Sequence, residues 1–194
     1  MTAIEAVRAS AREIEARVAA IAAAISADHP DGVVLVGVLK GSVCFLADLA
    51  RAMRVPCSID LLALSAYSPG EHRVRILKDL DGDIAGEAVV VVADVIDTGF
   101  SLSYIVGLLE QRRAASVRLC ALIARPERRI VPLEVDYVGF SCGEEFLIGY
   151  GLDFAERYRN LDALYVVDPN ALVNDRDAAE AALYGGYRDE EARG

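Results

Sequence analysis

The chain has 194 residues, of which 54% are hydrophobic and 26% are charged, and its formal net charge is −10. This length is typical of one domain, and the composition excludes an intrinsically disordered chain. The acidic balance argues against a general binder of nucleic acids or anionic membranes, because such binding needs clustered Lys and Arg. It is compatible with a single phosphate pocket built from backbone amides, a metal ion and a few basic residues.

No apolar run approaches the roughly 18 residues that span a bilayer, and the first residues lack the basic and apolar regions of a signal peptide. The four cysteines form no CxxC pair, and the two histidines are not spaced as zinc ligands. We therefore expect reduced cysteines and a cytoplasmic protein, with neither nucleic acid nor membrane as a partner.

The hydrophobic pattern alternates helices with buried strands. It predicts an amphipathic helix over residues 3–27, ended by the turn sequence at 29–32. Continuous β-branched runs between turn residues indicate strands that are buried on both faces. The predicted strands span residues 33–39, 56–65, 74–77, 88–93, 117–123, 137–140 and 164–167, and helices over 43–53 and 100–113 follow the first and the fourth of them.

This alternation predicts an α/β fold with a mostly parallel sheet flanked by helices. We expect residues 1–170 to form one domain. Residues 171–194 would be an appendage with a short helix over 172–183 and a polar tail from 185, either solvated or used as an oligomer contact. Ligands of such sheets bind beyond the carboxyl ends of the strands, which directs attention to residues 39–42, 94–101 and 124–126.

The most informative segment is the strand at 89–93, which leads to Asp94, to Asp97 and to a Thr-Gly-Phe-Ser turn that opens a helix. Gly99 lets the backbone turn tightly and approach a ligand. The amides of residues 97–101 at the start of the helix, with two hydroxyls of the turn, form an anion cradle. Two carboxylates beside a phosphate must face hydroxyls, a cation or a transferable proton. The alternative is a helix N-cap with a polar turn.

Residues 94–101 resemble the phosphoribosyl-pyrophosphate (PRPP) signature of type I phosphoribosyltransferases. Other segments, in the same order, are similar to bacterial hypoxanthine–guanine phosphoribosyltransferases, and the resemblance runs from about residue 12 to about residue 169. These segments are VLKGS at 38–42, SAY at 65–67, VRILKDLD at 74–81, YVGF at 137–140 and EFLIGYGLDFAERYRNL at 145–161. Several motifs in register make the resemblance specific.

The resemblance implies a Rossmann-like core and a small hood built from the N-terminal and late segments. It implies transfer of ribose 5-phosphate from PRPP to N9 of a 6-oxopurine, hypoxanthine or guanine, with Mg²⁺ and release of pyrophosphate. The expected partners are these small-molecule substrates and further copies of the chain in a dimer or tetramer.

The resemblance also implies roles for individual residues. Asp97 is the candidate general base or acid at the purine N7, and Asp94 faces the ribose hydroxyls and a metal ion. Arg125 contacts the base, Phe146 stacks on it, and the backbone of Leu147 reads its edge. The other roles are a second Mg²⁺ site (Asp153), the 5′-phosphate cradle (Asp97, Thr98, Gly99, Phe100 and Ser101), the pyrophosphate site (Leu39, Lys40, Gly41 and Arg159) and the mobile loop (Ser65, Ala66 and Tyr67).

Several of these assignments have a purely structural alternative. Lys40 is then a solvated turn lysine, Phe146 a core residue, Asp153 a cap and Arg159 a surface charge. In the family, the pyrophosphate loop often contains a strained or cis peptide, which the sequence by itself does not show.

Three features depart from the family pattern. Ala93 stands where the family has the first of two adjacent acids, and Arg125 replaces the lysine that donates to the purine 6-oxo group. The loop at 65–73 is short and contains Pro69, so its closure over the reacting centre would exclude water less well. The alternatives are therefore transfer to another base, a catalytically impaired nucleotide-binding relative, and a PRPP- or nucleotide-sensing regulator that binds RNA or a protein.

Overall fold

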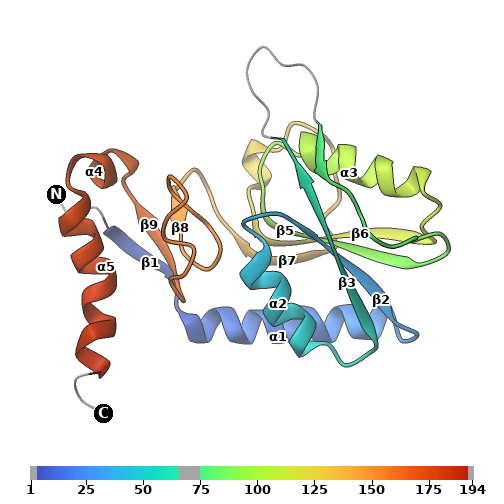
Figure 1. The fold of residues 1–194 in the computed structure, drawn as a ribbon, viewed down its shortest axis with the longest axis horizontal. Helices are drawn as coiled ribbons and strands as arrows, with labels where there is room; N and C mark the ends of the chain where they lie inside the picture. Colours follow the sequence, from blue (N-terminus) through green and yellow to red (C-terminus); the bar gives the residue numbers. More distant parts are fainter. Residues whose placement is uncertain (1–3, 66–74, 192–194) are drawn as a thin grey trace. The chain divides into compact units, whose positions relative to one another are not determined.

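The computed structural model describes residues 4–65 and 75–191, with side chains described as far as residue 185. The chain divides into two compact units (Figure 1). We call Glu15–Gly143 the core unit, and Met1–Ile14 with Glu144–Gly194 the hood unit.

The core unit contains a six-stranded sheet in the order β4-β3-β2-β5-β6-β7. Its strands are β2 (Val33–Val38), β3 (Cys57–Leu64), β4 (Ile76–Lys78), β5 (Ala88–Ile96), β6 (Ser116–Ala124) and β7 (Tyr137–Ser141). Every neighbouring pair is parallel except β3 and β4, which are antiparallel. The prediction of an α/β fold with a mostly parallel sheet is therefore confirmed.

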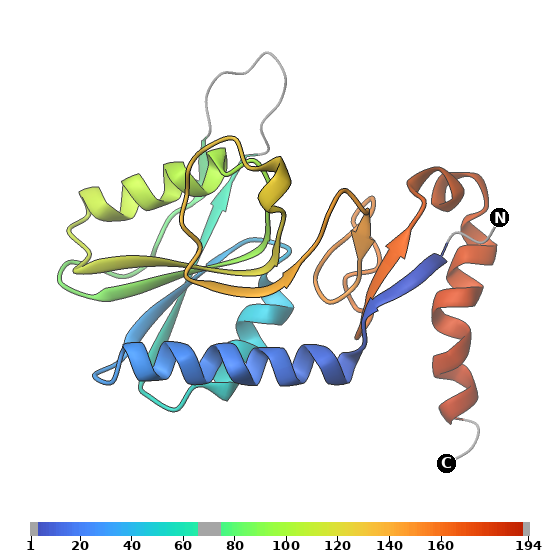
Figure 2. The same ribbon diagram turned by 180° about the vertical axis from the view of Figure 1, so that it is seen from behind.

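Helices cover both faces of this sheet: α1 (Ala11–Asp28) and α2 (Val43–Ala52) lie on one face, and α3 (Phe100–Gln111) on the other (Figures 1 and 2). Both faces of the central strand β5 are buried, which explains why its sequence is continuously apolar. Val89 and Val91 pack in one cluster with the buried side of α3. Val90 and Val92 point to the opposite face and are also fully buried.

The prediction of a single helix over residues 3–27 is wrong at its start. Residues Ile4–Ala9 form β1, which pairs antiparallel with β9 (Leu164–Val167). A capping box begins α1: the amide of Ser10 donates to Glu13 Oε2 at 2.8 Å, and the amide of Glu13 donates to Ser10 Oγ at 3.4 Å. The apolar spacing before Ser10 is compatible with a helix. The pairing of β1 with β9 and the cap at Ser10 instead make residues 4–9 a strand and start the helix after Ser10.

The hood unit is built on a three-stranded antiparallel sheet in the order β1-β9-β8, in which β8 is Leu147–Ile148. Two further helices, α4 (Pro169–Asn174) and α5 (Arg176–Glu191), follow β9. Leu172 of α4, with Ala179 and Leu183 of α5, is buried in one cluster with strand residues of this unit.

The C-terminal residues therefore differ from the sequence expectation of one short helix and a polar tail. The helix is interrupted at Asp175, and α5 continues through residues 185–191. Two glycines inside a helix cost only about 2 kcal/mol together, which the burial of α5 side chains offsets. Polar contacts also attach α5: Arg157 pairs with Glu180 at 3.0 Å, and the Tyr184 hydroxyl donates to Asn160 at 3.0 Å.

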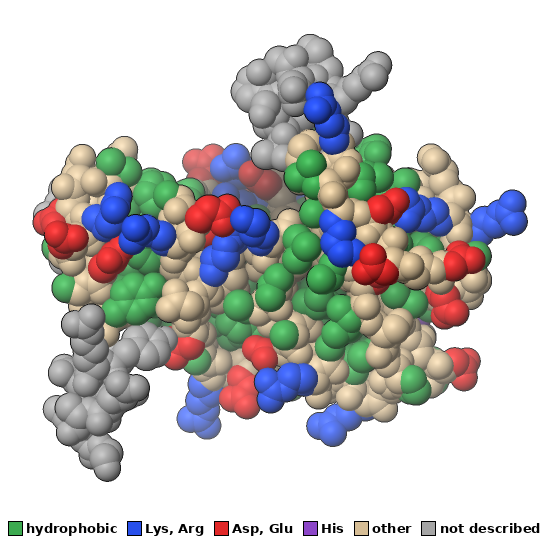
Figure 3. Space-filling model, viewed as in Figure 1, with side chains coloured by type: hydrophobic (Ala, Val, Ile, Leu, Met, Phe, Trp, Pro, Cys, Tyr) green, Lys and Arg blue, Asp and Glu red, His purple; other side chains and the backbone are tan. Residues whose placement is uncertain are grey.

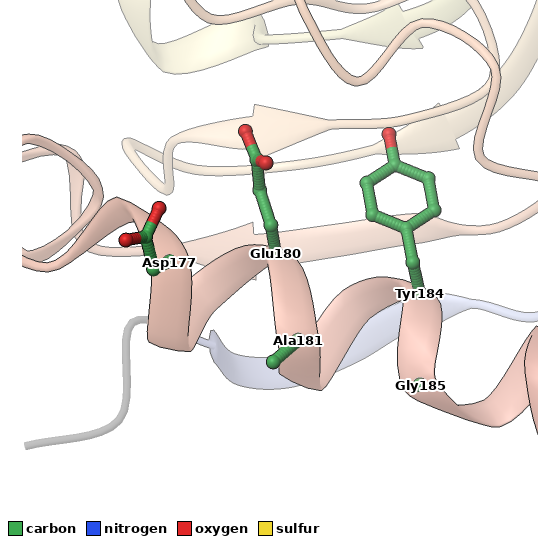
Figure 4. A pocket seen from close by; sticks show the side chains of 5 residues that line it. All are labelled: Asp177, Glu180, Ala181, Tyr184 and Gly185. Atoms are coloured by element: carbon green, nitrogen blue, oxygen red, sulfur yellow. The ribbon is translucent and has the colours of Figure 1, made fainter.

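The exposed part of α5 carries an open hollow of about 370 Å³ (Figure 4). Its lining consists of Asp177, Glu180, Ala181, Tyr184 and Gly185.

Within the described ranges, no helix has both the length and the apolar character needed to cross a bilayer.

His29 makes the stability of the core unit depend on pH. Burial lowers the pKa of His29, and its Nε2 atom has no hydrogen-bond partner among the described residues. The native state therefore binds fewer protons at His29 than the unfolded state, so stability is complete above the unfolded-state pKa of about 6.5 and falls as the pH drops through it.

We expect the free energy of unfolding in urea to be lower at pH 5.5 than at pH 7.5, by up to about 1.4 kcal/mol from His29. His29→Gln should remove this part of the pH dependence. An equal pH dependence in wild-type protein and His29→Gln would contradict the assignment.

Candidate functional site

Three loops meet at the carboxyl edge of the core sheet. The chain passes from β2 to β3 on one side and from β5 to β6 and β7 on the other, so the strand order reverses between β2 and β5. Ligands of α/β sheets bind at such a reversal. The loops after β2, β5 and β6 lie here, and the Arg125 amide ties the end of β6 to β5 by donating to Ile96 O at 3.0 Å.

The loop after β2 contains the predicted pyrophosphate residues. The Leu39–Lys40 peptide is cis, and the Leu39 amide donates to Leu62 O at 2.9 Å. Gly41 is buried against the Asp94 carboxylate, and a methyl group at position 41 would overlap that carboxylate. Asp94 lies inside β5, because this strand continues to Ile96, three residues beyond its predicted end.

The predicted anion cradle is the turn between β5 and α3. Gly99 is the N-cap residue of α3 and has a φ of 91°, in the left-handed region that favours glycine. Among the described residues no side chain caps this helix, so the amides of Phe100 and Ser101 point from an uncapped helix start. The alternative of an ordinary side-chain cap at this turn is therefore not what the structure shows.

Arg129 braces the cradle from the segment after β6. Its Nε donates to the Asp97 carbonyl at 3.1 Å, and its Nη1 donates to the Leu133 carbonyl at 2.9 Å. The amides of Ile130 and Val131 both donate to the Thr98 carbonyl, at 3.0 and 3.1 Å. Residues 129–131 therefore fix the backbone of the turn by hydrogen bonds to the carbonyls of Asp97 and Thr98.

The side chain of Asp97 meets a second arginine. Arg128 Nε lies 2.7 Å from Asp97 Oδ1 in an ion pair. Oδ1 is buried and accepts no hydrogen bond from the described residues, so the N–H of Arg128 does not point at it. Nothing in the segment ARPERR distinguishes Arg128 and Arg129 from surface charges, so the sequence does not predict these two contacts.

Arg125, the predicted contact of the base, follows β6 directly, so it starts at the same sheet edge as Asp97. Its Nε atom is buried and accounts for none of the hydrogen bonds found among the described residues. Gly41, Asp94, Asp97, Arg125 and the cradle thus all belong to one edge of the core unit.

The hood unit holds the other predicted residues. Phe146 is 38% exposed and packs edge-to-face on Phe154, with ring centroids 5.7 Å apart. Leu147 is buried in β8. Arg159 Nη2 pairs with Asp153 Oδ1 at 2.8 Å, while Asp153 Oδ2 accepts the Glu156 amide at 2.9 Å. The structure thus brings Asp153 and Arg159 together.

Only the first residue of the predicted mobile loop is described. Ser65 pairs with Arg75: its amide donates to the Arg75 carbonyl at 2.8 Å, and its Oγ accepts the Arg75 amide at 3.1 Å. Ala66 and Tyr67 lie outside the described residues. The base of the loop is therefore closed by hydrogen bonds.

No cluster of three or more His, Cys, Asp or Glu side chains in the described part of the chain has the geometry of a metal site. Single carboxylates remain as candidate ligands. The fold and the site together define an α/β protein in which three loops and the start of α3 lie together where the strand order reverses.

Comparison with known proteins agrees with this class. Residues 9–155 match the phosphoribosyl transferase domain. The chain is 42% identical to the hypoxanthine phosphoribosyltransferase of Haemophilus influenzae, with 78% of this chain and 89% of that protein covered. It is 39% identical to the hypoxanthine-guanine phosphoribosyltransferase of Mycobacterium avium, with 86% and 87% covered.

Among solved structures, the hypoxanthine phosphoribosyl transferase of Trypanosoma cruzi is similar, with a TM-score of 0.84 and 34% identity over 91% of this chain and 97% of that chain. The chain therefore belongs to the phosphoribosyltransferase family, which confirms the resemblance found in the sequence.

Gly41 provides a test of the site geometry. We expect Gly41→Ala to weaken PRPP binding by at least tenfold, since the added methyl group must displace the Asp94 carboxylate. Isothermal titration calorimetry measures this affinity. Gly107→Ala is the control, because its methyl group would meet nothing within 4 Å. Equal PRPP affinity in a folded Gly41→Ala protein would contradict the prediction.

Proposed function

We propose that this protein transfers ribose 5-phosphate from PRPP to N9 of hypoxanthine or guanine and releases pyrophosphate, as a purine salvage enzyme. The observation that carries this proposal is the uncapped start of α3 behind Gly99, at the reversal of the strand order. A helix start of this kind is a ready anion site. Family membership supports the same conclusion.

The phosphate groups would be divided between two loops. Residues 97–101 would hold the 5′-phosphate through their amides and through the hydroxyls of Thr98 and Ser101. Residues 39–41 would hold the pyrophosphate, with the exposed Lys40 as its cation. Asp94 lies between the two loops in contact with Gly41, which suits a carboxylate that accepts from ribose hydroxyls.

The donors present fit Mg²⁺. This ion is usually held by one or two carboxylates together with phosphate oxygens and water, and Asp94 of the core unit offers one carboxylate beside the pyrophosphate loop. Asp153 of the hood unit is the proposed ligand of a second ion. Mg²⁺ would neutralise charge on the leaving pyrophosphate. Because Arg159 already pairs with Asp153, both residues would exchange partners when substrates bind.

Asp97 is the proposed acceptor of the proton that the purine loses in the reaction. Attack of N9 on the ribose carbon leaves a proton to be removed from the purine ring, and Asp97 would accept or hold it at N7 as a general base. The Asp97 side chain is 36% exposed, which supports access of a ligand to this carboxylate. In the hood unit, Phe146 and the backbone of Leu147 remain the candidates for contacts with the base, by stacking and at its edge respectively.

Arg125 would select the base. Its guanidinium has only N–H donors and never accepts. Hypoxanthine and guanine present an acceptor oxygen at position 6, whereas adenine presents an amino donor. Two donors that face each other leave buried polar groups unsatisfied, at about 1–3 kcal/mol each.

The remaining properties follow the family and the composition. We propose a homo-oligomer, a dimer or a tetramer; the T. cruzi structure addresses the role of the C-terminal region in the oligomeric state and activity of that protein. The four free cysteines suit the reducing cytoplasm. On the face in Figure 3, basic side chains are interspersed with acidic ones, which supports an enzyme over an RNA-binding regulator.

A panel of purine and pyrimidine bases, each assayed with PRPP and Mg²⁺ for nucleotide and pyrophosphate, tests the proposal. We expect transfer to hypoxanthine and guanine. Transfer to another base would support the alternative specificity. Nucleotide binding without transfer would support an impaired relative or a regulator.

Substitution of Asp97 separates its proton-handling role from binding. We expect Asp97→Asn to lower kcat by about 10²–10⁴-fold with little change in KM for PRPP, because the amide retains the shape but cannot take the proton. The control is Asp79→Asn, which also removes a carboxylate paired with an arginine at 2.7 Å. An unchanged kcat would exclude Asp97 from this role.

Substitution of Arg125 tests base selection. We expect Arg125→Lys to keep or raise kcat/KM for hypoxanthine and guanine, since lysine still donates to the oxo group. Arg125→Met should lower both and narrow their margin over adenine, by about 5- to 160-fold if one unsatisfied polar group decides the preference. Adenine as the best substrate of the unmodified protein would refute this selection.

A further inference from the structure

The two carboxylate oxygens of Asp97 have different surroundings. Oδ1 is buried and lies 2.7 Å from Arg128 Nε, yet it accepts no hydrogen bond from the described residues. The Asp97 side chain as a whole is nevertheless 36% exposed. Because Oδ1 contributes essentially none of that exposure, Oδ2 is the oxygen through which this side chain can meet a ligand.

The position of Arg128 is set by its local structure. Residues Pro126–Arg128 form the 3₁₀ turn η1, and the Arg128 amide donates to the Arg125 carbonyl at 3.2 Å. A 3₁₀ helix has three residues per turn, so residues 125 and 128 project from the same side. The next residue, Arg129, is fixed to the Asp97 carbonyl by its own side chain. The turn before Arg128 and the hydrogen bond of Arg129 after it therefore both keep Arg128 next to Asp97.

Stability does not account for this ion pair. The two side chains are 42% and 36% exposed, and pairs with such exposure contribute about 0–1 kcal/mol. A variant that lacks the pair should therefore fold normally, so its activity reports on the orientation of Asp97.

We propose that Arg128 is a positioning residue: it covers Oδ1 of Asp97, fixes the rotation of the carboxylate, and so presents Oδ2 to the N7 proton of the purine. This inference rests on the proposed function. The carboxylate torsion of aspartate is intrinsically broad, so an unheld Asp97 would spend only part of its time in the productive orientation. Arg128 itself touches no reacting atom.

The kinetic test compares Arg128→Met and Arg128→Lys with the unmodified enzyme, using hypoxanthine and PRPP. Arg128→Met should lower kcat by about 10- to 100-fold, the range expected for a misplaced catalytic group, and should leave KM for PRPP within about threefold. Arg128→Lys keeps a cation near Oδ1 and should recover most of the loss. Arg112→Met, which breaks the Arg112–Asp79 pair at the far end of α3, is the control and should behave as wild type.

A spectroscopic test needs no turnover. In protein labelled with ¹³C-aspartate, the Asp97 carboxylate signal, identified by its loss in Asp97→Asn, should shift in Arg128→Met and return toward its wild-type position in Arg128→Lys. Unchanged kcat together with an unchanged signal in Arg128→Met would overturn the inference and leave the proposed function standing.

A different pattern would assign Arg128 to another role. A raised KM for PRPP with an unchanged kcat would mean that Arg128 binds phosphate, and would also overturn the inference. Absence of transfer by the unmodified protein would instead refute the proposed function, and with it the role at N7. The carboxylate signal would then still show whether Arg128 orients Asp97.

Discussion

The contact between Gly41 and the Asp94 carboxylate is the constraint on which the rest of the site depends. It joins the loop after β2 to the body of β5 where the strand order reverses, and only a residue without a side chain fits there. Because this contact is close, the proposed pyrophosphate loop at residues 39–41 lies directly beside Asp94, the proposed contact of the ribose. The cradle begins at Asp97, three residues after Asp94 and directly beyond the end of β5, so the same strand positions it.

The proposed anion site depends on the local arrangement of charges, because the formal net charge of the whole chain is −10. Two arginines lie against the turn 97–99 from the segment after β6, one on its backbone and one on its carboxylate. They hold the turn and offset the charge of Asp97. A helix start and a few placed cations suffice where overall charge is unfavourable.

Most of the core unit could be predicted from the sequence because its signals are local. Apolar runs such as Val89–Val92 mark strands that are buried on both faces, and the strands beside the proposed site were found within a few residues. The first helix was extended too far because the pairing of β1 with β9 joins segments about 160 residues apart. The capping box at Ser10 and Glu13 was the local signal that marks the true helix start. Similarly, β8 has two residues, too few for periodicity to reveal.

By itself, the sequence determined the fold class, the family and the cradle motif, because residue order along one strand and its following turn is enough to define them. Only the tertiary structure decided which side chains meet Asp97 and Asp94. Arg128 and Gly41 are separated from them by 31 and 53 residues and reach them through strand order and a 3₁₀ turn. Such contacts depend on the packing of distant segments, and an arginine that orients a carboxylate has the same sequence signature as one that faces water.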